Sequence, residues 1–153
     1  MEQLIIAAMK EIAALLISIS GDIHLLHFTV CGKGFDRFHA NVFKDYYEQL
    51  ATDFDEAVEL FLMFDDVEAI NPNVAASLIG WQSVDGQCVS VDNAVQLVQD
   101  RLQLLCDKLN VLYKACDEVK DCPKTVAITN WLHGRLEYWV KETNYFNKRR
   151  QMS

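Results

Sequence analysis

The stretch QLIIAAMKEIAALLISISGDIHLLHFTV, residues 3–30, decides the fold. Its apolar side chains recur every three or four positions, which predicts one long α-helix. Many of the positions between them are also apolar, so this helix is hydrophobic on nearly all sides. A helix of that kind is covered on more than one face, and burial between subunits is one expected reason.

This apolar stretch does not have the pattern of a targeting or membrane segment. A signal peptide begins with basic residues, whereas Glu2 follows Met1 here. A membrane-spanning helix needs about twenty uninterrupted apolar residues, and Lys10 and Glu11 interrupt the run. We therefore expect a cytoplasmic protein without a membrane segment, whose first helix is deeply buried.

Composition narrows the class of protein further. The 153 residues predict a single domain, residues 1–153. The 22 acidic residues against 14 basic ones give a net charge of -8, which argues against a protein that coats nucleic acid through a basic surface. Only 6 glycines and 2 prolines are present, too few for a turn-rich β-sandwich or a disordered chain.

The rest of the chain continues the helical pattern. Residues 31–34, CGKG, end the first helix, and a second periodic segment follows. Pro72 suits the start of a short helix inside the irregular region 65–91. Ser90 or Asp92 is expected to cap the third long helix. The predicted fold is all-α, a four-helix bundle with a short helix in its middle connection; the expected helices are about 3–30, 36–64, 73–81, 91–119 and 125–147.

Five cysteines are present, an odd number, and none of them forms a CxxC pair. This spacing excludes a zinc ribbon or a thioredoxin motif. The expected state is free, mostly buried thiols in a reducing compartment. The five residues are Cys31, Cys88, Cys106, Cys116 and Cys122.

Two histidines and two carboxylates are the candidates for chemistry. Asp55 and Glu59 are four residues apart and project from one helix face. His27 and His39 flank the first turn. Carboxylate and imidazole together suit a divalent iron ion with open coordination positions. The alternative is that the carboxylates line a solvated helix face and that the histidines are ordinary surface or hydrogen-bonded residues.

The string HFTVCGKGF, residues 27–35, followed by His39, resembles the helix junction of the Dps-type mini-ferritins. That family typically reads His-Trp-Asn-Val-Lys-Gly-x-x-Phe, with a second histidine twelve residues after the first. The string DEAVE, residues 55–59, is similar to the family's Asp-Glu-x-x-Glu. Trp139 in the last helix agrees more weakly.

The resemblance implies a ferritin-like bundle that assembles as a hollow shell of twelve copies. Such shells bind Fe(II) between two subunits, oxidise it preferably with hydrogen peroxide and store the ferric mineral, which protects against oxidative stress. By position, His27 and His39 of one subunit would face Asp55 and Glu59 of its two-fold partner. The alternative is a ferritin-like structural or partner-binding shell protein whose iron site is degraded and which catalyses nothing.

The carboxylates lie one residue later than the family pattern, and Phe28 replaces its tryptophan. The family's offsets from His39 fall on Phe54 and Val58, which cannot bind a metal. One residue rotates a helix by about 100°. Either a π-bulge takes up the extra residue, or His39 is displaced from the site.

Two other arrangements of carboxylates in the sequence are alternative metal sites. His133 and Glu137, four residues apart, could belong to a di-iron site inside one bundle, but the sequence has no Glu-x-x-His. The pairs Glu56/Glu59 and Glu118/Asp121 are similar to the magnesium ligands of all-α nucleotide pyrophosphohydrolases, although their separation is too long.

DNA binding is expected to be weak or absent. The first helix begins almost at the start of the sequence, which leaves no basic tail before it. Only Lys148, Arg149 and Arg150 are clustered at the other end. On an acidic body these three charges are expected to cap a helix dipole or to be solvated.

Overall fold

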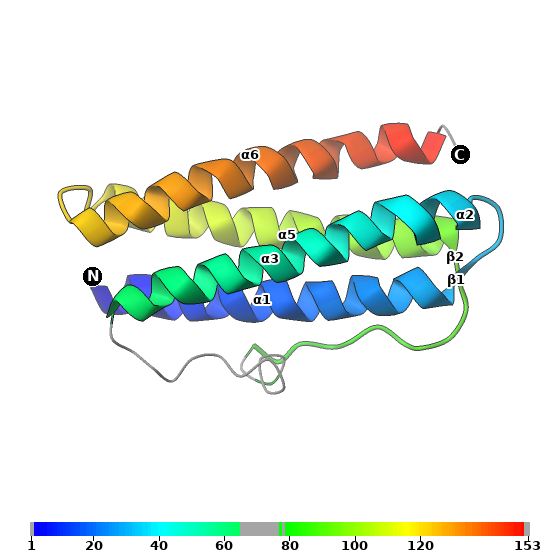
Figure 1. Ribbon diagram of the computed structural model, residues 1–153, viewed down its shortest axis with the longest axis horizontal. Coiled ribbons are helices and arrows are strands. Elements are labelled where there is room, and N and C mark those ends of the chain that lie inside the picture. Colours follow the sequence, from blue (N-terminus) through cyan, green and yellow to red (C-terminus); the bar gives the residue numbers. More distant parts are fainter. Residues whose placement is uncertain (1, 65–76, 78, 152–153) are drawn as a thin grey trace.

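The computed structural model describes residues 2–64, 77 and 79–151. Four long helices dominate the described part of the chain, and Figure 1 shows them lying side by side along one axis. They are α1 (Glu2–Thr29), α3 (Phe43–Phe61), α5 (Val91–Asp117) and α6 (Pro123–Gln151). The shorter elements are β1 (Val30–Cys31), α2 (Phe35–Arg37), a π-helix η1 (Phe38–Val42), a 3-10 helix η2 (Leu62–Phe64) and β2 (Val89–Ser90).

The predicted all-α bundle is confirmed. α1 packs against α3 and α5, and α5 packs against α6. In Figure 1, α3 and α5 run in the same direction, whereas α1 and α6 run in the opposite one. Two parallel helices that follow each other in sequence need a connection along the whole bundle, which is the crossover of ferritin-like folds. Its described part, residues 79–88, returns to the end where α1 finishes (Figure 1).

α1 is buried over most of its length. Five consecutive residues, 12–16, are each no more than 3% exposed, so at least one turn of the helix is covered on every side within a single chain. By length and composition alone, the segment Gln3–Thr29 could cross a membrane, although 50% of its most apolar window is buried inside the protein. The buried core helices of soluble proteins have the same properties.

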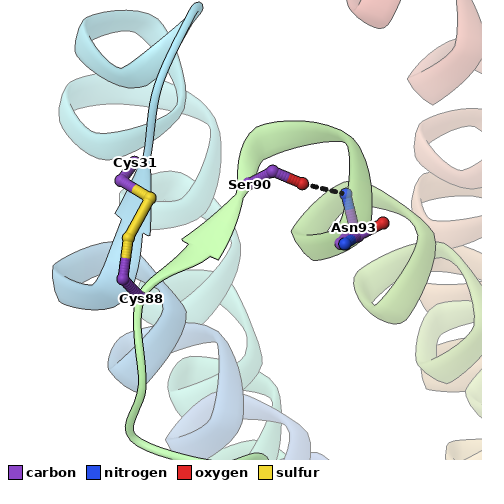
Figure 2. Close-up of a disulfide and its surroundings, with 4 residues drawn as sticks. All are labelled: Cys31, Cys88, Ser90 and Asn93. Atoms are coloured by element: carbon purple, nitrogen blue, oxygen red, sulfur yellow. Dashed lines mark hydrogen bonds between the residues drawn. A yellow bond between two sulfur atoms is a disulfide. The ribbon is translucent and has the colours of Figure 1, made fainter.

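A short parallel strand pair holds the crossover against the end of α1. Val30 pairs with Val89, and Cys31 pairs with Ser90. A disulfide joins Cys31 to Cys88 in the same place (Figure 2). The expectation that all five cysteines are free thiols is therefore wrong for this pair, because strand pairing brings together two residues that are 57 positions apart. Closing a loop of that length stabilises a fold by about 4 kcal/mol in the chain-entropy model.

A buried carboxylate fixes the crossover further along α1. Asp22 is 3% exposed and accepts hydrogen bonds from the indole of Trp81 at 2.8 Å and from the backbone N–H of Val84 at 3.3 Å. Arg101 of α5 forms an ion pair with it at 3.3 Å and lies over the Trp81 ring. Burial raises the pKa of Asp22, while these partners offset part of that effect. The carboxylate thus joins α1, the crossover and α5.

The ends of the long helices lie within four residues of the predicted bounds, except that the predicted helix 36–64 is divided into α2, η1, α3 and η2. Ser90 caps α5, since its side chain accepts a hydrogen bond from the N–H of Asn93 (Figure 2). α6 begins at Pro123, two residues before the expected start, and proline suits a first helical position because it lacks an N–H. Most of the predicted helix 73–81 lies outside the described residues. Its described end does not continue as a helix: residues 79–80 form a turn and Trp81 has no regular structure.

Candidate metal centre

A tight turn brings the two candidate histidines together. Gly32 and Gly34 both adopt positive φ angles, 93° and 90°, which glycine adopts without steric cost. The N–H of Phe35 donates to the carbonyl of Gly32, and the N–H of Phe38 donates to that of Gly34. The chain thereby reverses between α1 and α2 within a few residues.

His27 and His39, the histidine pair, lie face to face beyond this turn. Their ring centroids are 4.0 Å apart and the planes differ by 7°. Nδ1 of His39 is 2.6 Å from the backbone carbonyl oxygen of His27. Because a carbonyl only accepts hydrogen bonds, Nδ1 carries the proton, and in the neutral ring the lone pair is on Nε2. A backbone partner of this kind fixes the tautomer and orientation of many metal-binding histidines.

The His27 ring is buried and incompletely satisfied. It is 8% exposed, and its Nδ1 is fully buried without a hydrogen-bond partner among the described residues. Burial is the largest cause that lowers its pKa, and the positive charges that His39, His24 and Lys44 can carry lower it further. The ring is therefore neutral at pH 7, which is the protonation state that a metal ligand requires.

Other aromatic rings surround the histidine pair. His24 stacks on Tyr47 of α3 at 4.1 Å, and Tyr47 contacts His27 edge-on at 5.4 Å. Phe35 stacks on His39, and Phe28 contacts the edge of His27. Phe28 is 65% exposed and Phe35 36% exposed. Two exposed phenylalanines beside a buried imidazole leave an apolar surface at the site in a single chain.

His39 lies within a π-helix that precedes the predicted carboxylates. η1 covers Phe38–Val42, and the N–H of Phe43 donates to the carbonyl of Phe38, five residues earlier. A π-turn takes up one more residue than an α-turn, so it absorbs the register difference of one residue. Of the two possibilities raised by the sequence, the structure contains the π-bulge. His39 keeps its contact with His27 even though the carboxylates come late in the sequence.

Asp55 and Glu59 lie elsewhere on α3 in the same chain. Both are exposed, and four residues separate them, so they share one helix face. Tyr47 contacts His27, so it is the α3 residue that lies beside the histidine pair. Asp55 and Glu59 lie eight and twelve residues further along, about 12 and 18 Å at 1.5 Å per residue. The four predicted ligands of one chain therefore cannot hold the same ion. Within the described ranges, no group of three or more histidine, cysteine, aspartate or glutamate side chains could hold a metal.

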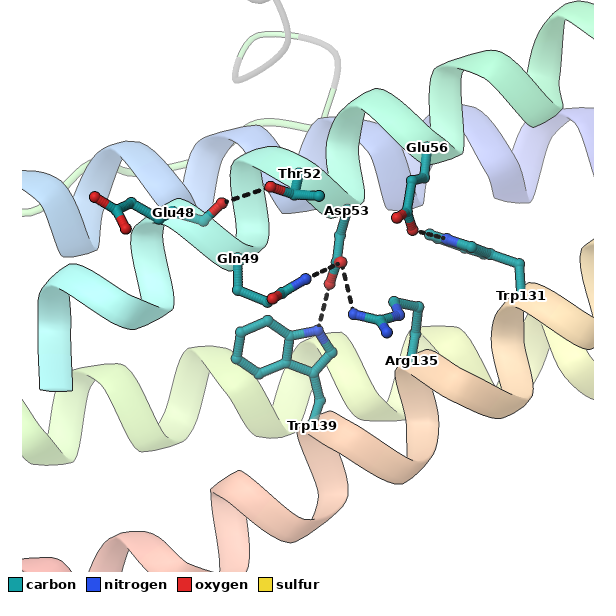
Figure 3. A network of polar contacts seen from close by, with 8 residues as sticks. All are labelled: Glu48, Gln49, Thr52, Asp53, Glu56, Trp131, Arg135 and Trp139. Atoms are coloured by element: carbon teal, nitrogen blue, oxygen red, sulfur yellow. Dashed lines mark hydrogen bonds and ion pairs between the residues drawn. The ribbon is translucent and has the colours of Figure 1, made fainter.

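The most buried carboxylate of α3 is not one of the candidates predicted from the sequence. Asp53 is fully buried and accepts hydrogen bonds from Gln49, Arg135 and Trp139 at 2.7 to 2.9 Å (Figure 3). We call these four residues the Asp53 network. Burial raises the pKa of Asp53, and its three partners oppose that shift. Two features of the sequence hinted at the Asp53 network: the four-residue spacing of Gln49 and Asp53, and the presence of Trp139. Neither feature identifies a partner of Asp53 on another helix.

The alternative sites of the sequence analysis are not assembled. His133 is exposed on α6 and contacts the Tyr113 ring edge-on at 5.0 Å. Glu137 forms an exposed ion pair with Lys141, four residues later. Glu56 accepts a hydrogen bond from the indole of Trp131 at 2.8 Å (Figure 3). Glu137 and Glu56 therefore each have a protein partner, as expected for carboxylates on a solvated helix surface.

No protein-family model and no curated protein matches the sequence. Solved structures match the fold, and three of them do so over 95% of the chain. The crystal structure of Helicobacter cinaedi CAIP matches with a TM-score of 0.85, 16% identity and 98% of its own chain covered. The DPS protein from Vibrio cholerae O1 matches with a TM-score of 0.82 and 16% identity, and 88% of its own chain is covered. That protein is described as a member of a broad superfamily of ferritin-like diiron-carboxylate proteins.

Antigen TpF1 from Treponema pallidum gives a TM-score of 0.82 and 15% identity, with 92% of that chain covered. At such low identity the likeness concerns the backbone and not the chemistry. The backbone nevertheless matches over 95% of this chain and over 88 to 98% of each of the three others. The chain has the Dps-type ferritin-like fold.

Proposed function

We propose that the protein is the subunit of a homo-oligomeric shell that binds Fe(II) between two subunits, oxidises it and stores the ferric product. The histidine pair carries this proposal. His27 is kept neutral by burial, and His39 is fixed in one tautomer by the His27 carbonyl. A neutral imidazole beside a second ring that is held in one orientation is prepared to bind a cation.

The carboxylates would come from a second copy. Asp55 and Glu59 are exposed and too far along α3 to reach the histidines of their own chain. In a two-fold dimer in which the α3 helices run antiparallel, the beginning of α3 in one subunit would lie against the end of α3 in the other. Such a dimer would bring both carboxylates of one subunit to the histidine pair of the other. Exposed Phe28 and Phe35 are apolar residues that such a contact would cover. The carboxylates would contribute negative charge to the Fe(II) site, and covering it would exclude bulk water.

Iron is the substrate in this proposal, with hydrogen peroxide as the preferred oxidant and the ferric mineral as the stored product. The cell compartment proposed is the cytoplasm, and DNA binding is proposed to be weak or absent because the chain carries a net charge of -8. A gel shift at low salt tests the last point. A clear shift there would contradict it.

A mixing experiment tests the site between subunits. One variant carries His27→Gln with His39→Gln, and the other carries Asp55→Ala with Glu59→Ala. Each alone is expected to lose peroxide-driven Fe(II) oxidation. When both chains are co-assembled at random, about a quarter of the sites combine intact histidines with intact carboxylates, so about a quarter of the activity should return. No recovery would contradict a shared site, provided that native mass spectrometry shows mixed shells.

Assembly itself is tested by the mass of the protein. Twelve copies of the 17.5 kDa chain form a shell of about 210 kDa. A wild-type shell that binds no Fe(II) and oxidises it no faster than buffer would support the second candidate, a structural shell with a degraded iron site. One observation favours that candidate: Lys44 lies close enough to His27 to lower its pKa, and a positive charge there also disfavours a divalent cation.

A further inference from the structure

One cysteine of the disulfide between Cys31 and Cys88 lies close to the histidine pair in sequence. Cys31 follows His27 by four residues and belongs to the turn that leads to His39. Cys88 is at the end of the crossover, one residue before β2. The disulfide therefore joins the turn between the two histidines to the end of the crossover, where the two-residue strand pair also lies.

The two sulfur-bearing residues differ in exposure. Cys88 is exposed, whereas Cys31 is half-buried. The three other cysteines take no part: Cys106 and Cys116 are buried and Cys122 is half-buried. An exposed disulfide is open to attack by a thiolate from solution, and the attack occurs at the sulfur that the nucleophile can reach.

We propose that Cys31 and Cys88 form a reversible latch that exchanges with small thiols and dithiols at Cys88 and controls how firmly the turn between His27 and His39 is held. Oxidised, the latch ties the crossover to the turn. Reduced, it leaves the turn joined to the end of the crossover by the backbone pairing of β1 with β2. The local effect stands independently of any iron chemistry, while its consequence for the site depends on the proposed function.

Reduction proceeds by two thiol exchanges. A thiolate of a dithiol attacks the Cys88 sulfur, the bond between the cysteines breaks, and the Cys31 thiolate leaves and takes up a proton. The second thiol of the dithiol then attacks the dithiol sulfur that is bound to Cys88, and the Cys88 thiol is released. The protein pair gains two electrons and two protons, and the dithiol becomes a disulfide.

Hydrogen peroxide can restore the latch. The Cys88 thiolate attacks one oxygen of the peroxide, the oxygen–oxygen bond breaks, and Cys88 becomes a sulfenic acid as water is formed. The Cys31 thiol then attacks the Cys88 sulfur, and a second water leaves. Two thiols and one peroxide give one disulfide and two waters. The proposed oxidant of iron would thus also close the latch beside the iron site.

The order of attack is tested by trapping the mixed disulfide. In a Cys122→Ser background, Cys31→Ser leaves Cys88 and the buried Cys106 and Cys116, whereas Cys88→Ser leaves Cys31 and the same two buried thiols. With oxidised glutathione, the Cys31→Ser chain is expected to gain one glutathione by intact mass spectrometry, at least roughly tenfold faster than the Cys88→Ser chain, because Cys88 is the exposed one. Equal rates, or faster labelling of Cys31, would overturn the assignment of Cys88.

The latch itself is tested by hydrogen exchange of the assembled protein before and after treatment with a dithiol. Backbone amides in residues 79–91 and 28–39 are expected to exchange roughly tenfold faster after reduction. The double variant Cys31→Ser with Cys88→Ser should exchange as fast as the reduced protein, and the dithiol should not change its exchange. Cys122→Ser should exchange like the wild type in both redox states. Equal exchange in the two redox states would overturn the latch.

Fe(II) oxidation measured on the same samples separates the two proposals. A change in rate with redox state, present in the wild type and absent in the double variant, supports control of the site. Altered exchange with an unaltered rate overturns that control. A wild type that oxidises no iron in either state overturns the proposed function, and the exchange result then still decides the latch.

Discussion

The Asp53 network and the histidine pair are two buried polar clusters that the fold treats differently. Both oxygens of Asp53 have partners, from its own helix and from α6. His27 is almost as buried, yet its Nδ1 has no partner among the described residues. A buried polar group that is satisfied stabilises the fold, whereas an unsatisfied one costs stability. The difference marks the first cluster as structural and makes the second the candidate binding site.

The largest expected effect comes from breaking the satisfied cluster. Asp53→Ala leaves the Trp139 indole without its acceptor and the Arg135 guanidinium without its buried partner. We expect the free energy of unfolding to fall by about 3 kcal/mol, because removing one member of a buried pair leaves the other uncompensated. Thermal unfolding measures it. Asp55→Ala, two residues away and exposed, is the matched control and should change stability by less than about 0.5 kcal/mol.

The opposite pattern is expected from the histidine pair. His27→Gln should lower peroxide-driven Fe(II) oxidation by about 100-fold, or about 2.7 kcal/mol, because a ligand is lost. Stability should stay close to that of the wild type, since the ring has no hydrogen bond from Nδ1 to lose. His133→Gln on α6 is the control for a change of residue type. If His27→Gln lost stability and kept activity, the proposed difference between the clusters would be wrong.

Much of this architecture could be predicted from the sequence. The three- and four-residue spacing in residues 3–30 and the few glycines and prolines give four long helices with nearly correct ends. The turn 31–34 follows from two glycines, and both have the positive φ angles that glycine alone adopts easily. Local patterns were sufficient because each helix is defined by its own periodicity.

What the sequence missed depends on contacts between distant residues. Cys31 and Cys88 are 57 positions apart, and only the β1–β2 pairing brings them together. Asp53 meets Trp139 across two helices, which no spacing rule can show. The π-helix was one of two possibilities, because one extra residue can be absorbed or can rotate the helix. The site itself stays a prediction, since its carboxylates would belong to a second chain.

The pH dependence of stability also distinguishes the Asp53 network from the histidine pair. Its expected effect is smaller than those of the two substitutions above. Burial lowers the pKa of His27 below the 6.5 of an unfolded chain. Below about pH 6.5 the unfolded state therefore binds more protons, so stability falls as the pH decreases toward the folded pKa and is unaffected above 6.5. Asp53 and Asp22 have raised pKa values, so they contribute the opposite slope at lower pH.

The comparison of the wild type with His27→Gln isolates this slope. Between pH 7.5 and 5.5, thermal unfolding should show a steeper loss of stability in the wild type. Asp53→Asn, compared in the same way, should leave the slope near pH 6.5 in place. Parallel curves for the wild type and His27→Gln would mean that the imidazole is not held neutral by its surroundings.

The smallest expected effect concerns the charge beside the site. Lys44 is exposed on α3, and its charge contributes to the lowered pKa of His27. If the histidine pair binds Fe(II), that charge repels the ion. Lys44→Gln should therefore tighten Fe(II) binding a few-fold, as measured by anaerobic titration, and the gain should shrink in high salt because exposed charges are screened. Lys114→Gln on α5 removes the same charge from another helix and should change little. A loss of affinity in Lys44→Gln would instead mean that Lys44 holds part of the site in place, and an equal gain in both variants would attribute the effect to net charge rather than to the position of Lys44.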